Sequence, residues 1–215
     1  GLNALTANTT GGENVAVGAL ALDANTTGGA NVAVGASALG AITTGDSCTA
    51  VGYEALVVNT AVSNTAIGRS ALGATTSGTA NVAVGAYSLD ANTTASNNTA
   101  VGYSSLGANT TGTNMTAVGK NAGLSHTTGN SSTFIGTDSG KLTTTGIGNT
   151  FVGDGSGRQN TTGASNVAMG QSALLANTTA SNNTAVGYVA LEANTTGANN
   201  VALGANALDA NTTAN

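Results

Sequence analysis

The sequence predicts an all-β protein built as a parallel β-solenoid, with one coil for each 17-residue repeat. Three observations support this prediction: a glycine at fixed spacing, a short apolar segment before it, and a Thr-rich segment after it. The glycines are 17 residues apart, except for one interval of 16. They are Gly18, Gly35, Gly52, Gly68, Gly85, Gly102, Gly119, Gly136, Gly153, Gly170, Gly187 and Gly204.

We interpret the whole chain, residues 1–215, as a single repeat array. A partial copy covers residues 1–13, and twelve copies start at residues 14, 31, 48, 64, 81, 98, 115, 132, 149, 166, 183 and 200. Residues 115–165 form a variant block. The chain starts within a repeat and without Met, as expected of a processed product or a part of a longer array.

The composition suits a repeating cross-section better than an ordinary globular core. Hydrophobic residues make up 40% of the chain, mostly Ala, Val and Leu, whereas aromatic residues make up only 3%. The apolar surface is therefore divided into small, evenly spaced portions. A disordered chain would not return an aliphatic residue in phase in every copy, so we exclude disorder.

Charge and hydropathy exclude two further classes of function. The net charge is −5, and the four basic residues Arg69, Lys120, Lys141 and Arg158 are far apart in the sequence. A nucleic-acid partner is not expected, because phosphate binding needs clustered basic residues. The longest apolar runs have only four or five residues, which predicts no membrane insertion.

Positions two to four of the repeat, numbered from Asn14, predict a strand that is buried on both faces. Position two is Val or Thr, position three is Ala or Phe, and position four is aliphatic. The glycine at position five indicates a corner that needs positive φ, or the close approach of another chain. The Asn that occupies position one in most copies predicts a ladder of stacked side chains.

Positions eight to fourteen predict a second strand with one buried face. Leu at position nine, Ala at eleven and Thr at thirteen alternate with polar residues. Period-two alternation directs those three inward and positions ten, twelve and fourteen outward. The exposed columns are then an Asn column at position twelve and a Thr column at position fourteen.

The first strand is apolar on both faces, and two arrangements would cover the face that its own coil leaves open. Three rolls packed around an axis is one arrangement, and a wider single-chain solenoid is the other. In the packed arrangement we expect Val84 and Val101 inside the roll, with Ala83 and Ala100 toward the neighbouring chain. A charge at Ala100 is then expected to break the oligomer.

The segment Asn183 to Gly197, Asn-Thr-Ala-Val-Gly-Tyr-Val-Ala-Leu-Glu-Ala-Asn-Thr-Thr-Gly, resembles the head repeats of YadA-like trimeric autotransporter adhesins. It is also similar to repeats of phage tail fibres and of bacterial surface filaments. The resemblance extends over essentially the whole chain and implies a left-handed β-roll that forms a homotrimer. It also implies an extracellular, cell-surface or virion-fibre location, and a host-surface or matrix ligand. Adhesin, tail fibre and self-assembling filament remain as three alternatives.

The variant block exchanges large and small residues. Leu at position nine is replaced by Gly123, Gly140 and Gly157, and two of these copies contain the only phenylalanines, Phe134 and Phe151. This exchange predicts that one interior space is filled from either position, because cores conserve volume. The alternative is an aromatic binding spot at Phe134 and Phe151.

Residues that carry chemistry are too sparse for a catalytic centre. His126 is the only histidine; it replaces the Asn of the predicted wet face and has no triad or metal partners in the sequence. Cys48, the only cysteine, is interpreted as an inert substitution at position one. We therefore predict no enzymatic activity, no cofactor and no metal site.

The repeat also creates Asn-x-Ser/Thr sequons, which are acceptors for N-glycosylation where a transferase is present. Because position twelve is predicted to be exposed, glycans would project in a row, although the sequon also follows from the repeat itself. The candidate acceptors are Asn8, Asn25, Asn92, Asn109, Asn160, Asn177, Asn194 and Asn211.

The function that the sequence favours is a non-enzymatic extracellular fibre segment, structural or adhesive, that extends and attaches. Its main partner is then the protein itself, as a homotrimer or a longer filament. The alternative is an ice-binding β-solenoid that uses an outward Thr/Asn ladder to order water.

Overall fold

The computed structural model describes residues 1–214, and this part of the chain contains short parallel strands and no helix. Each strand has three residues and occupies positions two to four of one repeat. The strands are β1 Val15–Val17, β2 Val32–Val34, β3 Thr49–Val51, β4 Thr65–Ile67, β5 Val82–Val84, β6 Thr99–Val101, β7 Thr116–Val118, β8 Thr133–Ile135, β9 Thr150–Val152, β10 Val167–Met169, β11 Thr184–Val186 and β12 Val201–Leu203.

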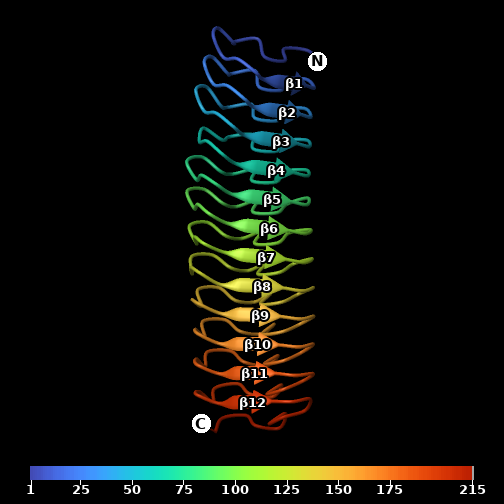
Figure 1. Ribbon diagram of the computed structural model, residues 1–215, viewed down its shortest axis with the longest axis vertical. Helices are drawn as coiled ribbons and strands as arrows, with labels where there is room; N and C mark the ends of the chain where they lie inside the picture. Colours follow the sequence, from blue (N-terminus) through green and yellow to red (C-terminus); the bar gives the residue numbers. More distant parts are fainter. Residues whose placement is uncertain (215) are drawn as a thin grey trace. The chain divides into compact units, whose positions relative to one another are not determined.

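The chain divides into two compact units, Gly1–Thr111 with β1 to β6 and Gly112–Asn215 with β7 to β12. Within each unit every strand pairs in parallel with the next strand in the sequence, so the coils stack in order (Figure 1). Val15 pairs with Val32, 17 residues later, whereas Thr49 pairs with Thr65 across the shorter repeat. The predicted parallel β-solenoid with one coil per repeat is confirmed.

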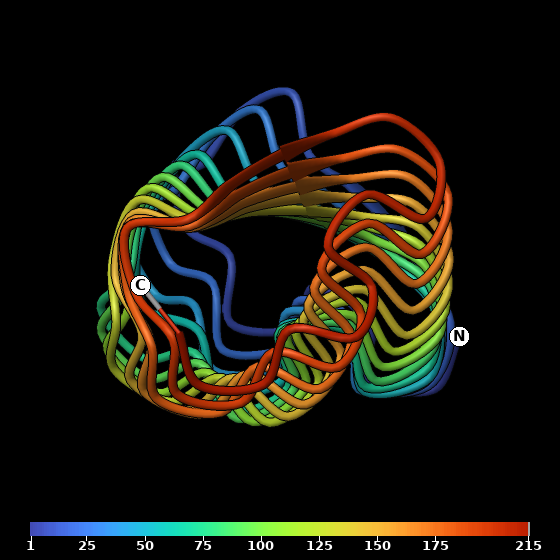
Figure 2. The same cartoon turned by 90° about the horizontal axis from the view of Figure 1, so that it is seen from below.

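The interior of each coil is lined by positions three, eight and nine. From β2 to β11 the third-position side chain has 0% exposure, as at Ala83 and Ala100. The ninth-position leucines of these coils, for example Leu89, are equally buried, whereas Leu208 in the last coil is 49% exposed. A view along the stack shows the strand on one side of the coil and turns that close the other sides (Figure 2).

The predicted second strand at positions eight to fourteen is wrong. These residues form turns and bends, and the backbone is left-handed at positions seven and nine, with φ of 56° at Leu20 and 55° at Leu22. Such residues cannot direct side chains to alternate faces as a strand does. The buried positions of this segment are eight, nine and twelve, instead of nine, eleven and thirteen.

Stacking holds these left-handed residues in place. A left-handed conformation costs an L-residue about 1–2 kcal/mol. Most of these residues donate the backbone N–H to a carbonyl of a neighbouring coil, as Leu20 does to Leu2 and Leu22 to Ala38. The hydrogen bonds between coils therefore offset a strain that recurs in every repeat.

The position-five glycines show both features that the sequence analysis considered. Their φ angles lie between 118° at Gly204 and 142° at Gly52, where glycine is favoured. The coils also approach closely, because a Cβ added at Gly85 would lie 2.5 Å from the carbonyl oxygen of Gly102. Any side chain at such a position would strain one coil and collide with the next.

Two columns of buried asparagines cross-link the coils. At position one, Asn31 donates from Nδ2 to the Gly45 carbonyl (2.9 Å), while its Oδ1 accepts the backbone N–H of Cys48 (2.9 Å). At position twelve, Asn177 donates directly to Oδ1 of Asn160 (2.8 Å). The side-chain ladder predicted for position one therefore forms mainly at position twelve.

Candidate functional site

The outward face of the strand ladder carries positions two and four, and this reverses the orientation expected from the sequence. Ala83 and Ala100 are fully buried inside their coils, whereas Val84 and Val101 point outward and are half-buried. The expectation that Val84 and Val101 lie inside and that Ala83 and Ala100 face a neighbour is wrong. A charge at Ala100 would therefore enter the coil interior and not an interface.

The physical reason is the narrow space between the strand and the opposite wall of the coil. A Cβ on Gly140 would lie 2.5 Å from the ring of Phe134, and a Cβ on Gly157 would lie 2.5 Å from the ring of Phe151. Positions three and nine thus share one space, as the volume exchange in the sequence predicted. Alanine fits at position three where leucine occupies position nine.

The outward face is apolar and uncovered in the single chain. Its more exposed side chains include Ile67 (41%) and Val82 (37%) in the first unit, and Ile135 (38%) and Met169 (44%) in the second. Threonine occupies position two in several coils, as at Thr99. Parallel sheets are usually covered on both faces, so this face lacks the layer that normally packs on such a sheet.

The predicted aromatic binding spot is wrong, because Phe134 and Phe151 have 0% exposure. Their ring centroids lie 5.7 Å apart inside the second unit. The phenylalanines fill the interior and present nothing to a ligand.

His126 is also interior, although the sequence placed it on a wet face. Its ring has 0% exposure and packs at an angle against Phe134, with the centroids 5.9 Å apart. Nδ1 lies 3.1 Å from the carbonyl oxygen of Thr144, so Nδ1 carries the hydrogen, and the buried Nε2 has no partner. Burial lowers the pKa of His126 to about 4, and the ring is therefore neutral at pH 7.

The sequon asparagines do not form an exposed row. Asn25, Asn92, Asn109, Asn160, Asn177 and Asn194 have 0% exposure, and Asn8 and Asn211 are half-buried. The six central side chains lie inside the coils, in the position-twelve column. The expectation that position twelve is exposed is wrong.

The threonines at positions thirteen and fourteen lie at the surface. Most position-thirteen hydroxyls donate to a carbonyl of the next coil, as Thr26 Oγ1 does to the Thr43 carbonyl (3.1 Å) and Thr144 Oγ1 to the Thr161 carbonyl (3.1 Å). The fourteenth-position side chains, such as Thr27 and Thr162, are exposed. The outward polar column therefore consists of threonine, without the asparagines expected beside it.

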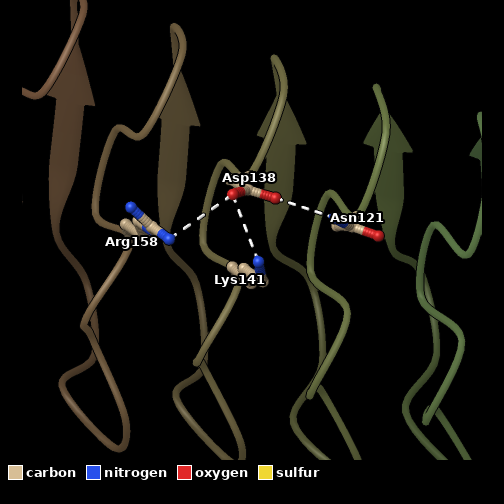
Figure 3. A network of polar contacts seen from close by, with 4 residues as sticks. All are labelled: Asn121, Asp138, Lys141 and Arg158. Atoms are coloured by element: carbon tan, nitrogen blue, oxygen red, sulfur yellow. Dashed lines mark hydrogen bonds and ion pairs between the residues drawn. The ribbon is translucent and has the colours of Figure 1, made fainter.

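Charged side chains meet at one place in the variant block (Figure 3). Asp138 pairs with Lys141 Nζ at 3.2 Å and with Arg158 Nη2 at 3.6 Å, and it accepts a hydrogen bond from Asn121 Nδ2 at 2.9 Å. Burial alone would raise the pKa of Asp138, but these hydrogen bonds and positive charges hold it below its usual value. The network connects three consecutive coils, and partly exposed pairs of this kind contribute little stability each.

Chemistry beyond hydrogen bonding has little support in residues 1–214. That range contains no group of three or more His, Cys, Asp or Glu side chains placed to hold a metal ion. Cys48 is free and buried at position one, and burial raises the pKa of its thiol. The same range has no helix long and apolar enough to cross a membrane.

One surface cluster was not singled out in the sequence. Positions six and seven, which directly follow the corner glycine, bring Tyr53, Arg69, Tyr87 and Tyr103 together in the first unit. The signal was available in the sequence, since these residues are in phase or one position apart in consecutive copies.

Comparison with known proteins gives no relative: no family model, no curated protein and no solved structure matches the chain.

Proposed function

We propose that the chain is a non-enzymatic, extracellular fibre segment that extends and attaches, and that it assembles with copies of itself through the outward face of its strands. The supporting observation is the uncovered apolar column of position four, with Ile67, Ile135 and Met169 among its more exposed members. The resemblance to trimeric adhesin repeats favours three left-handed rolls in one rod, located at a cell surface or on a virion fibre.

Self-association explains why this face stays apolar. An outward side chain that met only water would be free to become charged, as position six does with Arg69, Lys120 and Asp154. Positions two and four instead contain only Val, Thr, Ile, Met and Leu in every copy. Burying such a column against another copy contributes roughly 25 cal/mol for each Å² of apolar surface removed from water.

The test is the molar mass of the purified protein by light scattering. The chain mass is 20.3 kDa, so a trimer would have three times this mass. We expect a stable oligomer at micromolar concentration. A monomer would contradict both the assembly and the adhesin-like function.

Ice binding is the second candidate, supported by the exposed threonine column at position fourteen. In-register threonines on a solenoid offer a regular array of hydroxyl and methyl groups to water. The column is interrupted at Ala61 and Ser77, and the asparagines expected to widen it are buried. Thermal hysteresis in a protein solution separates the two functions, because a fibre segment that only assembles should show none.

A further inference from the structure

A cluster of tyrosines and one arginine forms a continuous aromatic surface on the first unit. The guanidinium of Arg69 lies 5.8 Å from the ring centroid of Tyr53 and 5.6 Å from that of Tyr87. Tyr87 and Tyr103 meet edge to face, with centroids 5.9 Å apart. The four side chains come from four consecutive coils, so the cluster runs along the stack. We call it the tyrosine ladder.

The solenoid itself does not require this cluster. Tyr53 is 50% exposed and Tyr103 is 52% exposed, and equivalent positions in other coils are filled by alanine, for example Ala36 and Ala86. The chain has only four tyrosines and no tryptophan, yet three of the four lie in this ladder. Large exposed aromatic groups gathered in this way mark binding surfaces more often than packing.

The ladder is also preorganised. The Arg69 guanidinium lies within cation–π range of two rings, and this attraction restrains all three side chains. The neighbouring Glu54 carboxylate, as a hydrogen-bond acceptor and a negative charge, raises the pKa of the Tyr53 hydroxyl. A ligand that meets these groups would lose little free energy in ordering them.

A hollow of about 520 Å³ is lined in part by Glu54 and Ser70, which directly follow the ladder residues Tyr53 and Arg69 in the chain. Glu54, Ser70 and Asp90 supply its polar groups, while Val57 and Val58 supply an aliphatic wall. The Asp90 carboxylate has no hydrogen-bond or ion-pair partner among residues 1–214, and partial burial raises its pKa. Two acceptor carboxylates, one hydroxyl and an apolar wall are thus open beside a row of aromatic faces.

We propose that the tyrosine ladder and the hollow together bind a neutral polysaccharide of pyranose sugars. The apolar C–H faces of such rings stack on exposed tyrosines, and their hydroxyl groups donate to Glu54 and Asp90 and accept from Arg69. This inference rests on the proposed function, since it gives the attaching fibre a class of ligand.

Charge and spacing favour this ligand over other stacking ligands. Two carboxylates against one guanidinium leave the site with a net negative charge, which disfavours nucleic acids and sulfated glycans. The coils repeat at roughly 4.8 Å, and an extended β-linked glycan advances by nearly the same length for each sugar. Successive sugars would therefore meet successive coils.

The absence of tryptophan makes tyrosine fluorescence a direct probe of this site. The intact protein is titrated with cellohexaose, xylohexaose and chitohexaose, with glucose and heparin alongside. We expect saturable quenching or enhancement with at least one neutral hexasaccharide, and none with glucose or heparin. Tyr53→Ala and Tyr103→Ala should each weaken that binding at least tenfold, as measured by calorimetry.

Tyr188→Ala is the matched control, because Tyr188 is 56% exposed at the same repeat position in the second unit, away from any other tyrosine in the sequence. It should leave affinity unchanged. The inference is overturned if no neutral hexasaccharide binds, if heparin binds instead, or if Tyr188→Ala weakens binding as much as Tyr53→Ala. Light scattering on the same samples separates the two proposals: an oligomer that binds no glycan defeats only this inference, whereas a monomer that binds a glycan defeats the proposed assembly and fibre function but not the glycan site.

Discussion

In coils of the first unit, the leucine of the far wall fills the interior of the coil. In the phenylalanine coils of the second unit, the side chain of the strand fills it instead. Near Ala83 the strand contributes a methyl group and Leu89 fills the coil from the far wall. Near Phe134 the strand contributes the ring, and Gly140 leaves the far wall empty for it. The comparison shows that in these coils the core is filled either from position nine or from position three, and that position three points into the core in both.

The largest effect is expected from breaking this exchange. Phe134→Ala should destabilise the protein by about 3–5 kcal/mol, because neither wall would then fill the coil. Gly140→Leu alone should also destabilise, by about 1–3 kcal/mol, since its side chain would overlap the ring. The double variant recreates the Ala and Leu of the other coils and should be more stable than Phe134→Ala.

Thermal and denaturant unfolding of the four proteins gives the coupling energy between the two positions. The backbone can accept leucine at position 140, because Gly140 has φ of 57° and Leu39 has φ of 51° at the equivalent position. If the loss of unfolding free energy in the double variant equals the sum of the losses in the two single variants, the two positions do not share one space.

The second prediction is a pH dependence of stability caused by His126, which packs on Phe134. The pKa of about 4 in the folded protein lies below the unfolded value of 6.5, so the unfolded chain binds the proton more tightly. The contribution of neutral His126 to the free energy of unfolding is fully present above pH 6.5 and is lost as the pH falls toward 4. The total loss is about 3 kcal/mol.

The control for this pH dependence is His126→Asn, which installs the residue found at position twelve in most copies. Unfolding free energies are measured between pH 7 and pH 4 for both proteins. We expect the variant to lose less stability over this range. Equal slopes would show that His126 titrates normally in the folded protein.

The smallest of the three effects concerns the glycine corners, which both kinds of coil share. Gly85→Val should cost about 1–3 kcal/mol from backbone strain at φ of 133°. The new Cβ would also lie 2.5 Å from the Gly102 carbonyl oxygen, and this collision adds to the loss. Gly12→Ala is the control, because a Cβ there meets nothing within 4 Å. Thermal melts should show a loss for Gly85→Val alone, and an unchanged melt for it would assign the glycine column another cause.

The regular part of the fold was predictable from the sequence. Equal spacing of the glycines predicted the coil length, and the in-phase apolar residues predicted the parallel strands that pair Val82 with Thr99. Stacking of identical copies follows from repetition alone, so it needs no knowledge of the loops. The second strand was not predictable by alternation, because left-handed residues such as Leu20 and Leu22 interrupt it.

The prediction of which side chains of the first strand point inward was wrong for a different reason. Val-Ala-Val has no polar face, so alternation alone does not say which side is inward. The exchange of Phe134 with Gly140 contained the answer, since two residues that share one space must both point into it. The tyrosine ladder was overlooked although its signal was present: Tyr53 and Tyr103 occupy the same repeat position, and applying the predicted stacking register to exposed side chains would have brought the cluster together.

The central claim is that position three fills the coil while position four meets a neighbouring copy. A paired substitution at adjacent residues, Ala100→Asp and Val101→Asp, tests it most directly, with circular dichroism melts and light scattering on each variant. We predict that Ala100→Asp buries an unpaired charge and lowers the melting temperature sharply, whereas Val101→Asp keeps the fold and lowers the molar mass. A folded, dissociated Ala100→Asp beside an unfolded Val101→Asp, or an intact oligomer in both variants, would contradict the account.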